Sequence, residues 1–199
     1  RCLMHWIGGM GIVVLFVAIF PVLGVGAKQL FKTEVPGPIT EGLAPRIKET
    51  ALALWWIYAG LTILCTALLN AFGMELYDAI CHAMSTLGTG GFSTRSASAG
   101  HWDNAALHWI LSLFMFIAGS NFALFYGAVR GNWRGLVGNS ELRFYLGLNM
   151  VVIFVVFLNI VGRHGGVEPA LRHATFQVLS VTTTTGFMTE DFETYGDLS

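Results

Sequence analysis

Charged residues are scarce in this sequence. Asp, Glu, Lys and Arg make up 12% of its 199 residues, whereas a soluble domain carries about 25%. This scarcity excludes an ordinary water-soluble globular protein. The 11 basic and 12 acidic residues almost balance. The chain therefore has no basic surface of the kind that binds nucleic acid, and we expect no nucleic-acid partner.

Cysteine is scarce as well. Cys2, Cys65 and Cys81 form no C-x-x-C pair and have no histidine or carboxylate at the spacing of a metal ligand. The sequence therefore predicts neither a zinc site nor a disulfide framework. We expect the three side chains to serve as small apolar packing groups.

What the sequence does contain is long uncharged runs. The windows without any charged residue are 2–27, 50–74, 104–129 and 144–162. A helix of about 20 residues crosses the roughly 30 Å core of a bilayer. The pattern thus predicts an all-α integral membrane protein. Its expected spans cover about 3–23, 48–71, 104–129 and 142–162.

The basic residues orient these spans. Seven of the eleven lie in two short connections, 28–48 and 130–143, and eight of the twelve acidic residues lie on the opposite side. Because basic loops face the cytoplasm in membrane proteins, both connections are expected to be cytoplasmic. The chain then ends on the outer side. Since it begins at Arg1 within an apolar run, we interpret it as part of a longer membrane protein.

An internal repeat lies between the spans. Residues 83–94 resemble residues 178–189 at an offset of 95 positions. The matched pairs are Ser85 and Ser180, Thr89 and Thr184, Gly91 and Gly186, Phe92 and Phe187, and Thr94 and Thr189. Each copy follows an apolar span and a short loop. The repeated unit is therefore a span, a short helix, a turn rich in Gly and Thr, and a second span.

The two turns are too polar and too short to cross a membrane. Non-helical backbone at membrane depth is tolerated only where protein or a water-filled cavity satisfies its polar groups. Gly/Thr turns can direct their carbonyl groups into a pore, where they replace the water around a cation. The preceding segments, 76–86 and 170–181, are expected to be re-entrant helices whose C-terminal ends favour cations. The alternative is that the glycines serve only close helix packing.

Five stretches carry a resemblance to a known family. They are Trp6-Ile7-Gly8-Gly9-Met10-Gly11, the segment from Gly24 to Pro38, Pro45-Arg46-Ile47-Lys48-Glu49-Thr50, Gly90-Gly91-Phe92-Ser93-Thr94, and Thr184-Thr185-Gly186-Phe187. In this order and spacing they resemble the membrane subunits of the Trk/Ktr/HKT potassium transporter superfamily, most closely the bacterial TrkH type.

The resemblance implies a fold of repeated span, pore helix, filter loop and span units around a pseudo-fourfold pore, of which this chain holds a part. It makes 1–27 the second span of the first repeat and 28–47 a cytoplasmic loop. The complete second repeat would be 48–130, with span 48–71, pore helix 76–86, filter 87–92 and span 104–129. A cytoplasmic loop, 131–141, would lead to the first half of the third repeat, 142–199, with span 142–162, pore helix 170–181 and filter 182–187.

The resemblance also implies a function, which is uptake of K⁺ without enzymatic chemistry or an organic cofactor. The transported K⁺ would be coordinated by the backbone carbonyls of Thr89, Gly90, Gly91, Thr184, Thr185 and Gly186. Gly88 and Thr183 would lie at the inner end of the filter. The family associates Gly at positions 91 and 186 with K⁺ selectivity and Ser there with Na⁺ passage.

Partners and location follow from the same resemblance. The full-length subunit is expected to form a homodimer in the bacterial cytoplasmic (inner) membrane, as a multi-pass protein surrounded by lipid. Its cytoplasmic side is expected to bind a cytosolic, nucleotide-binding regulatory subunit of the Trk type.

Other functions remain as alternatives. A secondary transporter of a small solute would use broken helices, but it predicts inverted repeats, whereas these repeats run in the same orientation. A Na⁺-permeable member of the same superfamily is a second alternative. An intramembrane hydrolase could use Ser85, Ser93 or Ser120 with His82 or His108, although no G-x-S-x-G nucleophile turn is present.

Three further polar residues invite interpretation. Asn121 lies midway down an expected span and so faces protein or the pore rather than lipid. His82 is expected to bond to the scaffold of its short helix. Arg95 directly follows the first turn and is expected to brace it.

Overall fold

The structure is a computed structural model that describes residues 1–9, 11, 43–129, 138–162 and 165–190. Every regular element within these ranges is a helix, which confirms the predicted all-α class. The elements are α1 (Cys2–Gly9), α4 (Leu43–Ala71), α5 (Leu76–Leu87), the 3-10 helix η1 (Ser98–His101), α6 (Ala105–Ala118), α7 (Phe122–Val129), α9 (Ser140–Ile160) and α10 (Val167–Thr182).

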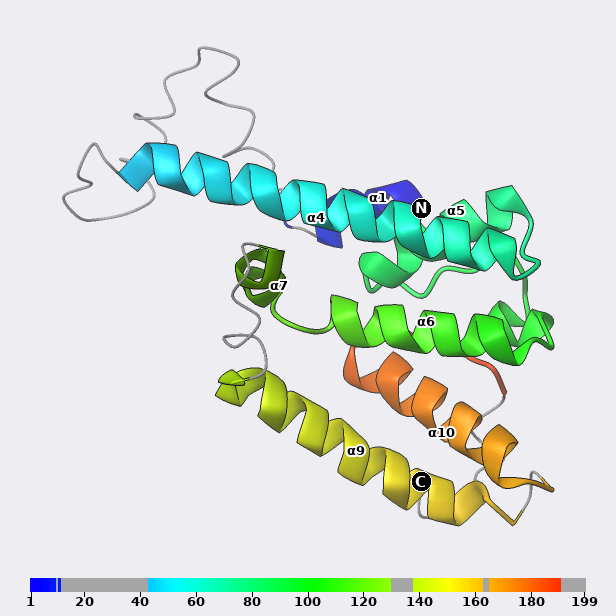
Figure 1. Ribbon diagram of the computed structural model, residues 1–199. Coiled ribbons are helices and arrows are strands. Elements are labelled where there is room, and N and C mark those ends of the chain that lie inside the picture. The colour runs from blue at the N-terminus through cyan, green and yellow to red at the C-terminus, as the bar shows by residue number, and fades with distance from the viewer. Residues whose placement is uncertain (10, 12–42, 130–137, 163–164, 191–199) are drawn as a thin grey trace.

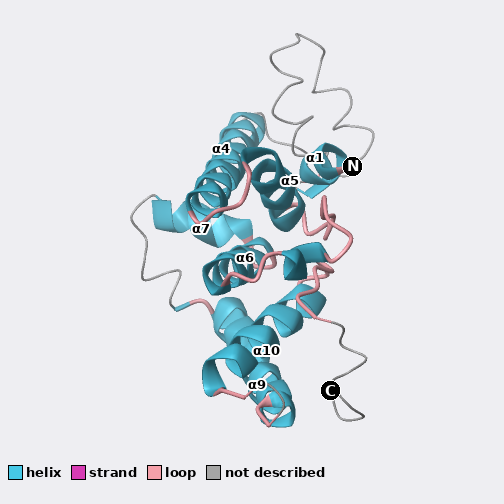
Figure 2. Ribbon diagram, turned by 90° about the vertical axis from the view of Figure 1, so that its right-hand side faces the viewer, coloured by secondary structure: helices cyan, strands magenta, loops and turns pink. Residues whose placement is uncertain are grey.

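The two long helices α4 and α9 form opposite edges of the molecule. In Figure 1, α4 runs along the top and α9 along the bottom, with α6 and α10 between them. Figure 2 shows α6 between the α4 and α5 pair and the α9 and α10 pair. The helix α5 contacts α1, α4 and α6, whereas α10 contacts α9 and α6. Two similar halves therefore meet at α6.

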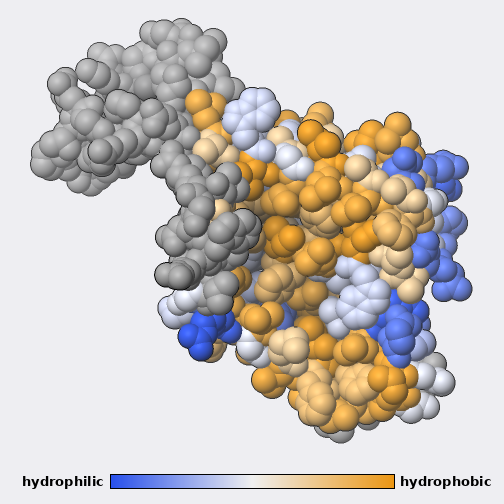
Figure 3. Space-filling view, viewed as in Figure 1, coloured by the Kyte–Doolittle hydropathy of each residue, from blue (hydrophilic) through white to orange (hydrophobic). Residues whose placement is uncertain are grey.

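Two of the described helices are long and apolar enough to cross a membrane, Ala51–Ala71 and Ser140–Ile160. Figure 3 shows apolar residues covering most of the face that it presents, with hydrophilic residues along the right-hand edge and a smaller group at the lower left. The expected first span, about 3–23, lies largely outside the described residues, and so do most of the basic connections 28–48 and 130–143.

The helices before the two turns are short. The helix α5 has 12 residues and α10 has 16, which makes them about 18 and 24 Å long and shorter than a bilayer core. The first lies where the re-entrant helix 76–86 is expected. The second begins at Val167, three residues before its expected start, because Gly166 with an extended backbone leads directly into the first turn.

The expected span 104–129 is not one continuous helix. The helix α6 ends at Ala118, and α7 begins at Phe122. At the break, the Ser120 hydroxyl donates a 2.7 Å hydrogen bond to the carbonyl of Ile117. A serine that bonds back in this way competes with the helical hydrogen-bond ladder. The helix is therefore interrupted within the expected span.

A cluster of four polar side chains joins α10 to α6. Arg172 Nη1 donates to His108 Nδ1 at 2.7 Å, and Arg172 Nε donates to Glu168 Oε1 at 3.2 Å. Trp109 Nε1 donates to the same carboxylate oxygen at 3.3 Å. Because Arg172 is only 8% exposed, these charge-assisted bonds fix the position of α10 on α6.

Candidate functional site

The two Gly/Thr turns share an unusual backbone conformation. Thr89 and Gly91 have φ values of 49° and 64°, and their counterparts Thr184 and Gly186 have φ values of 59° and 86°. A left-handed backbone is costly for a β-branched residue such as threonine. Its recurrence at matched positions, 95 residues apart, indicates that both turns are built to the same plan.

Each turn also leaves its helix in the same way. The amides of Gly88 and Thr183 donate to carbonyls four residues earlier, both at 3.0 Å. The following amides, of Thr89 and Thr184, donate to carbonyls three residues earlier, at 3.1 and 3.0 Å. The negative ends of α5 and α10 therefore lie immediately before the two turns, where they favour a cation.

A buried serine ties each turn to its own helix. The amide of Phe92 donates to Ser85 Oγ at 2.6 Å. In the second copy the Ser180 hydroxyl donates to the carbonyl of Phe187, also at 2.6 Å. Both serines are buried, so each holds the outer end of its turn against the short helix.

The two turns lie against each other. A β-carbon on Gly91 would overlap the carbonyl oxygen of Thr185 and would lie 3.0 Å from the carbonyl carbon of Gly186. The structure thus brings Gly91 together with two of the predicted site residues of the other turn. Gly186 itself faces open space, since a β-carbon there would meet no atom within 4 Å.

The remaining predicted site residues differ in their burial and in their neighbours. Thr185 is buried, and its Oγ1 lies 2.7 Å from Thr183 Oγ1. Thr184 is exposed. Thr89 and Gly90 lie beside α1, since Thr89 shares a hollow with Gly8 and Gly9 and a β-carbon on Gly90 would be 2.5 Å from His5 Nδ1.

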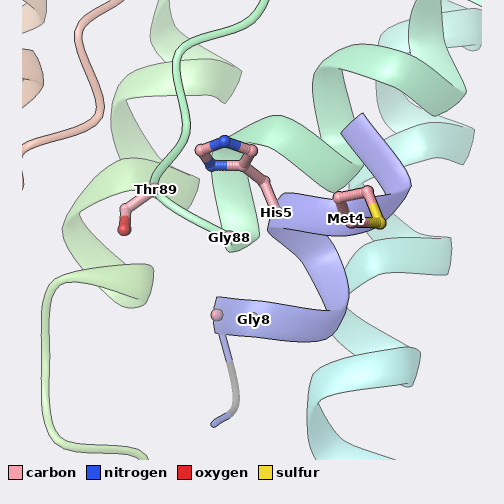
Figure 4. Close-up of a pocket in the computed structure, with 6 residues that line it drawn as sticks. Met4, His5, Gly8, Gly88 and Thr89 are labelled. Atoms are coloured by element: carbon pink, nitrogen blue, oxygen red, sulfur yellow. The ribbon is translucent and has the colours of Figure 1, made fainter. Parts of the chain in front are cut away.

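His5 is a neighbour of the first turn that the sequence does not predict. Its ring meets that of Phe92 edge to face, with centroids 4.7 Å apart. Figure 4 shows the ring beside the turn at Gly88, with the Thr89 side chain pointing away from it. An open hollow of about 450 Å³ lies here, and its lining residues are Met4, His5, Gly8, Gly9, Gly88 and Thr89.

A salt bridge braces the first turn from outside. Arg95 Nη2 donates to the carboxylate of Asp78, in the first turn of α5, at 2.9 Å. Burial alone would raise the pKa of Asp78, but hydrogen bonds from Thr94 and Arg95 and the charge of Arg95 together lower it. The carboxylate therefore stays ionised. This contact fulfils the bracing interpretation of Arg95.

The second turn has a matching brace, in which a histidine takes the place of the aspartate and a glutamate takes the place of the arginine. His173 occupies the position 95 residues after Asp78, and Glu190 occupies the position 95 residues after Arg95. His173 Nε2 lies 3.3 Å from Glu190 Oε1, and His173 Nδ1 lies 3.0 Å from Thr189 Oγ1. In both copies the short helix is thus tied to the chain that follows its turn.

His82 links the two copies. Its Nδ1 lies 2.7 Å from the carbonyl oxygen of Asp78, and its Nε2 lies 2.9 Å from Ser93 Oγ. Its ring stacks on Phe187 of the second turn, with centroids 5.5 Å apart. His82 is completely buried, so its contact with Ser93 holds the scaffold together, as expected from the sequence.

The other two serines considered for hydrolysis have backbone partners. Ser85 Oγ accepts the Phe92 amide, and the Ser120 hydroxyl donates to the Ile117 carbonyl. Asn121, at the break between α6 and α7, lies near α9, where its Nδ2 is 3.4 Å from Glu141 Oε2.

Comparisons with known proteins agree on one family. The model of the family described as "TrkH: Cation transport protein" matches residues 1–197. The "Trk system potassium uptake protein TrkH" of Halomonas elongata is 44% identical over 96% of this chain and 40% of its own length. The protein of the same name from Escherichia coli K12 is 40% identical over 96% of this chain and 40% of its own length.

A solved structure gives the same result. The crystal structure of the potassium transporter TrkH from Vibrio parahaemolyticus matches with a TM-score of 0.77 and 38% identity. The match covers 96% of this chain and 39% of that chain. The chain thus spans about two fifths of the length of the relatives that it matches.

Proposed function

Because the chain belongs to the TrkH family of cation transport proteins, we propose that it forms part of a membrane subunit that takes up K⁺ through a filter of backbone carbonyls. The names of its relatives support K⁺ as the ion, since several are called potassium uptake proteins. The transported ion is the substrate in this proposal, and no bond is made or broken.

One observation carries the proposal. Two adjoining turns, 95 residues apart in the sequence, hold Thr and Gly in left-handed conformations at matched positions. Such a backbone allows carbonyl groups to line a narrow passage and replace the water around a dehydrated cation. We assign this coordination to Thr89, Gly90, Gly91, Thr184, Thr185 and Gly186.

The surroundings of the turns support the same assignment. The C-terminal ends of α5 and α10 contribute partial negative charge next to the proposed ion path. The serine bonds and the outer braces fix both turns to rigid helices. A filter that is held in this way keeps its carbonyl groups in a defined arrangement around the proposed ion path.

The proposal includes the division into repeats. In it, 48–130 form one complete unit of span, pore helix, filter and span around a pseudo-fourfold pore, and 142–199 begin the next. Residues 1–27 end the unit before. The contacts of α5 with α1 and of α10 with α6 support this division. Each pore helix then lies on the second span of the preceding unit.

Glycine at positions 91 and 186 supports K⁺ over a Na⁺-permeable alternative, because the family associates Gly at these positions with K⁺ selectivity and Ser with Na⁺ passage. A transporter of small solutes with inverted repeats finds less support. The two described copies of short helix and turn run in the same direction and adjoin at their turns.

Assembly and location complete the proposal. We place the protein in the bacterial inner membrane as a homodimer of full-length subunits, surrounded by lipid. A cytosolic nucleotide-binding regulatory subunit would bind the side that carries the connections 28–47 and 131–141. The basic residues of these connections support this placement.

The test is uptake of ⁸⁶Rb⁺ or K⁺ by cells that lack their own K⁺ uptake systems and express the complete reading frame. Gly186→Arg is expected to abolish uptake and growth at low K⁺, because the open space beside Gly186 would be filled by a cationic side chain.

The matched control is Gly138→Arg. This glycine is also free of neighbours within 4 Å but lies far from either turn in the sequence, just before α9. It should leave uptake unchanged. If Gly186→Arg inserts into the membrane and transports at the rate of the unaltered protein, the assignment of the second turn to the ion path is wrong.

A further inference from the structure

A glycine at the end of α1 touches the start of the first turn. A β-carbon on Gly9 would lie 2.7 Å from the α-carbon of Gly88 and 2.7 Å from Tyr58 Oη. Gly88 is the first residue after α5, and Tyr58 is buried on α4. Three helices therefore converge on a point that has no room for any side chain.

The same arrangement recurs at the end of α6. A β-carbon on Gly119 would lie 2.6 Å from Thr183 Cγ2 and 2.7 Å from Tyr145 Oη. Thr183 is the first residue after α10 and matches Gly88 at the offset of 95. Tyr145 lies on α9, the long helix of its own half, as Tyr58 does on α4.

Aromatic stacking shows that the close contacts at Gly9 and at Gly119, here called the two glycine joints, correspond to each other. Three residues before each glycine stands an aromatic residue, Trp6 or Phe116. Trp6 stacks on Tyr58 with centroids 5.4 Å apart and an interplanar angle of 26°. Phe116 stacks on Tyr145 at 4.9 Å and 17°. Each joint thus consists of a ring pair beside a glycine contact.

A polar residue four positions after each tyrosine completes the pattern. The Thr62 hydroxyl donates to the carbonyl of Tyr58 at 2.8 Å and accepts from Trp6 Nε1 at 2.9 Å. Asn149 Nδ2 donates to the carbonyl of Tyr145 at 2.8 Å, and its Oδ1 accepts from the Thr182 hydroxyl at 2.8 Å. Both residues therefore tie the tyrosine helix to a neighbouring element.

These contacts act on the inner ends of both turns. Gly88 and Thr183 directly precede Thr89 and Thr184, whose left-handed backbones open the two turns. Protein interiors are close-packed, so an added methyl group must displace its neighbours. A displacement at Gly88 or Thr183 passes directly to the residues that we assign to the ion path.

We propose that Gly9 and Gly119 are positioning residues for ion selectivity, which hold the inner ends of the two filter turns without touching the ion. This inference rests on the proposed K⁺ filter. Each glycine belongs to the helix of one unit and acts on the turn of the next, so the joints set the spacing between neighbouring walls of the filter.

The test compares ⁸⁶Rb⁺ uptake and its competition by K⁺ and Na⁺ in cells that express the complete reading frame with Gly9→Ala or Gly119→Ala. We expect the preference for K⁺ over Na⁺ to fall by about tenfold. This corresponds to a change of about 1.4 kcal/mol in the difference between the activation free energies for K⁺ and Na⁺ passage. The matched controls are Gly8→Ala and Gly147→Ala, because a β-carbon at either position meets nothing within 4 Å. Both should retain the original preference.

A compensating variant separates selectivity from simple misfolding. Thr183→Ser removes the methyl group nearest to Gly119 but keeps the hydroxyl that bonds to the Leu179 carbonyl, and Tyr145→Phe removes the other close atom. Together they should restore the preference in Gly119→Ala. At Gly9 an added β-carbon would still collide with the backbone of Gly88. Tyr58→Phe should therefore not restore the preference for K⁺ in Gly9→Ala.

Each outcome bears on one claim. If the unaltered protein takes up no Rb⁺ or K⁺, the proposed function fails whatever the glycine variants do. If the unaltered protein prefers K⁺ over Na⁺, and Gly9→Ala and Gly119→Ala both insert into the membrane and keep the same preference, the positioning role is overturned. If the alanine variants do not accumulate in the membrane, the double variant Thr183→Ser with Tyr145→Phe is tested in the protein that keeps Gly119. It loosens the contact at Gly119 by removing atoms and adds none that could overlap. An unchanged preference in that double variant would equally overturn the role.

Discussion

Gly91 and Gly186 hold matched positions in the two turns but have different surroundings. Both have a left-handed backbone, which strains any residue with a β-carbon. Only Gly91 also faces another chain segment, the Thr185 carbonyl of the adjoining turn. A substitution at Gly91 therefore carries a steric penalty that the same substitution at Gly186 avoids.

This difference predicts unequal effects of serine. Gly91→Ser should reduce the preference for K⁺ over Na⁺ by about tenfold or more, whereas Gly186→Ser should reduce it less, because only the first displaces a neighbouring carbonyl. Competition of Na⁺ against ⁸⁶Rb⁺ uptake measures both. Equal effects, or a larger effect at Gly186, would contradict the asymmetry between the turns.

The residues of the turns could be found from the sequence because the repeat marks them twice. Their neighbours could not. His5 meets the first turn from a helix more than 80 residues away, and the contact of Gly91 with Thr185 joins two copies that the sequence presents separately. A signal for the glycine joints exists nonetheless, since Trp6-Ile7-Gly8-Gly9 parallels Phe116-Ile117-Ala118-Gly119.

At the scale of the elements, α6 connects the two halves. It contacts both α5 and α10 and ends at the Gly119 joint. The short helices could be predicted because polar Gly/Thr turns follow them. The break after α6 could not, since the window 104–129 is uncharged throughout and only the contacts of Gly119 and Ser120 explain it.

The polar link between α10 and α6 gives an element-scale prediction. Arg172→Met should lower the free energy of unfolding by about 2 kcal/mol, because it removes charge-assisted hydrogen bonds and leaves His108 and Glu168 without them. Thermal unfolding of the purified protein in detergent measures the change. Leu171→Met, at an exposed neighbouring position, is the control and should unfold like the original. Identical unfolding of both variants would show that the link does not fix α10.

At the scale of the whole molecule, five of the seven described acidic residues lie at one end of the helices, whereas Glu49 and Glu141 lie near the other. The acidic residues next to the short connections there are Glu75, Asp103, Glu168 and Glu190. The opposite end adjoins the two basic connections that the sequence places in the cytoplasm. The sequence resemblance to the TrkH type is confirmed by the match over residues 1–197, which no single motif could have established.

This arrangement predicts the accessibility of the loops. A cysteine introduced at Lys32 should be protected from a membrane-impermeant thiol reagent added to intact cells, whereas one at Asp103 should react, because basic connections stay in the cytoplasm. Both substitutions require a background in which every cysteine of the complete reading frame is replaced by Ala, Cys2, Cys65 and Cys81 included. Labelling at position 32 from outside would reverse the proposed orientation.

The exchanged side-chain types of the two outer braces limit how the duplicated segments can be recombined. A crossover that joined α5 to the chain after the second turn would place Asp78 opposite Glu190, two carboxylates of like charge. The reciprocal crossover would place His173 opposite Arg95. Either product loses its brace, because neither new pair joins a hydrogen-bond donor to a carboxylate. Each short helix therefore fits only the chain that follows its own turn, although the two turns share left-handed backbones at matched positions.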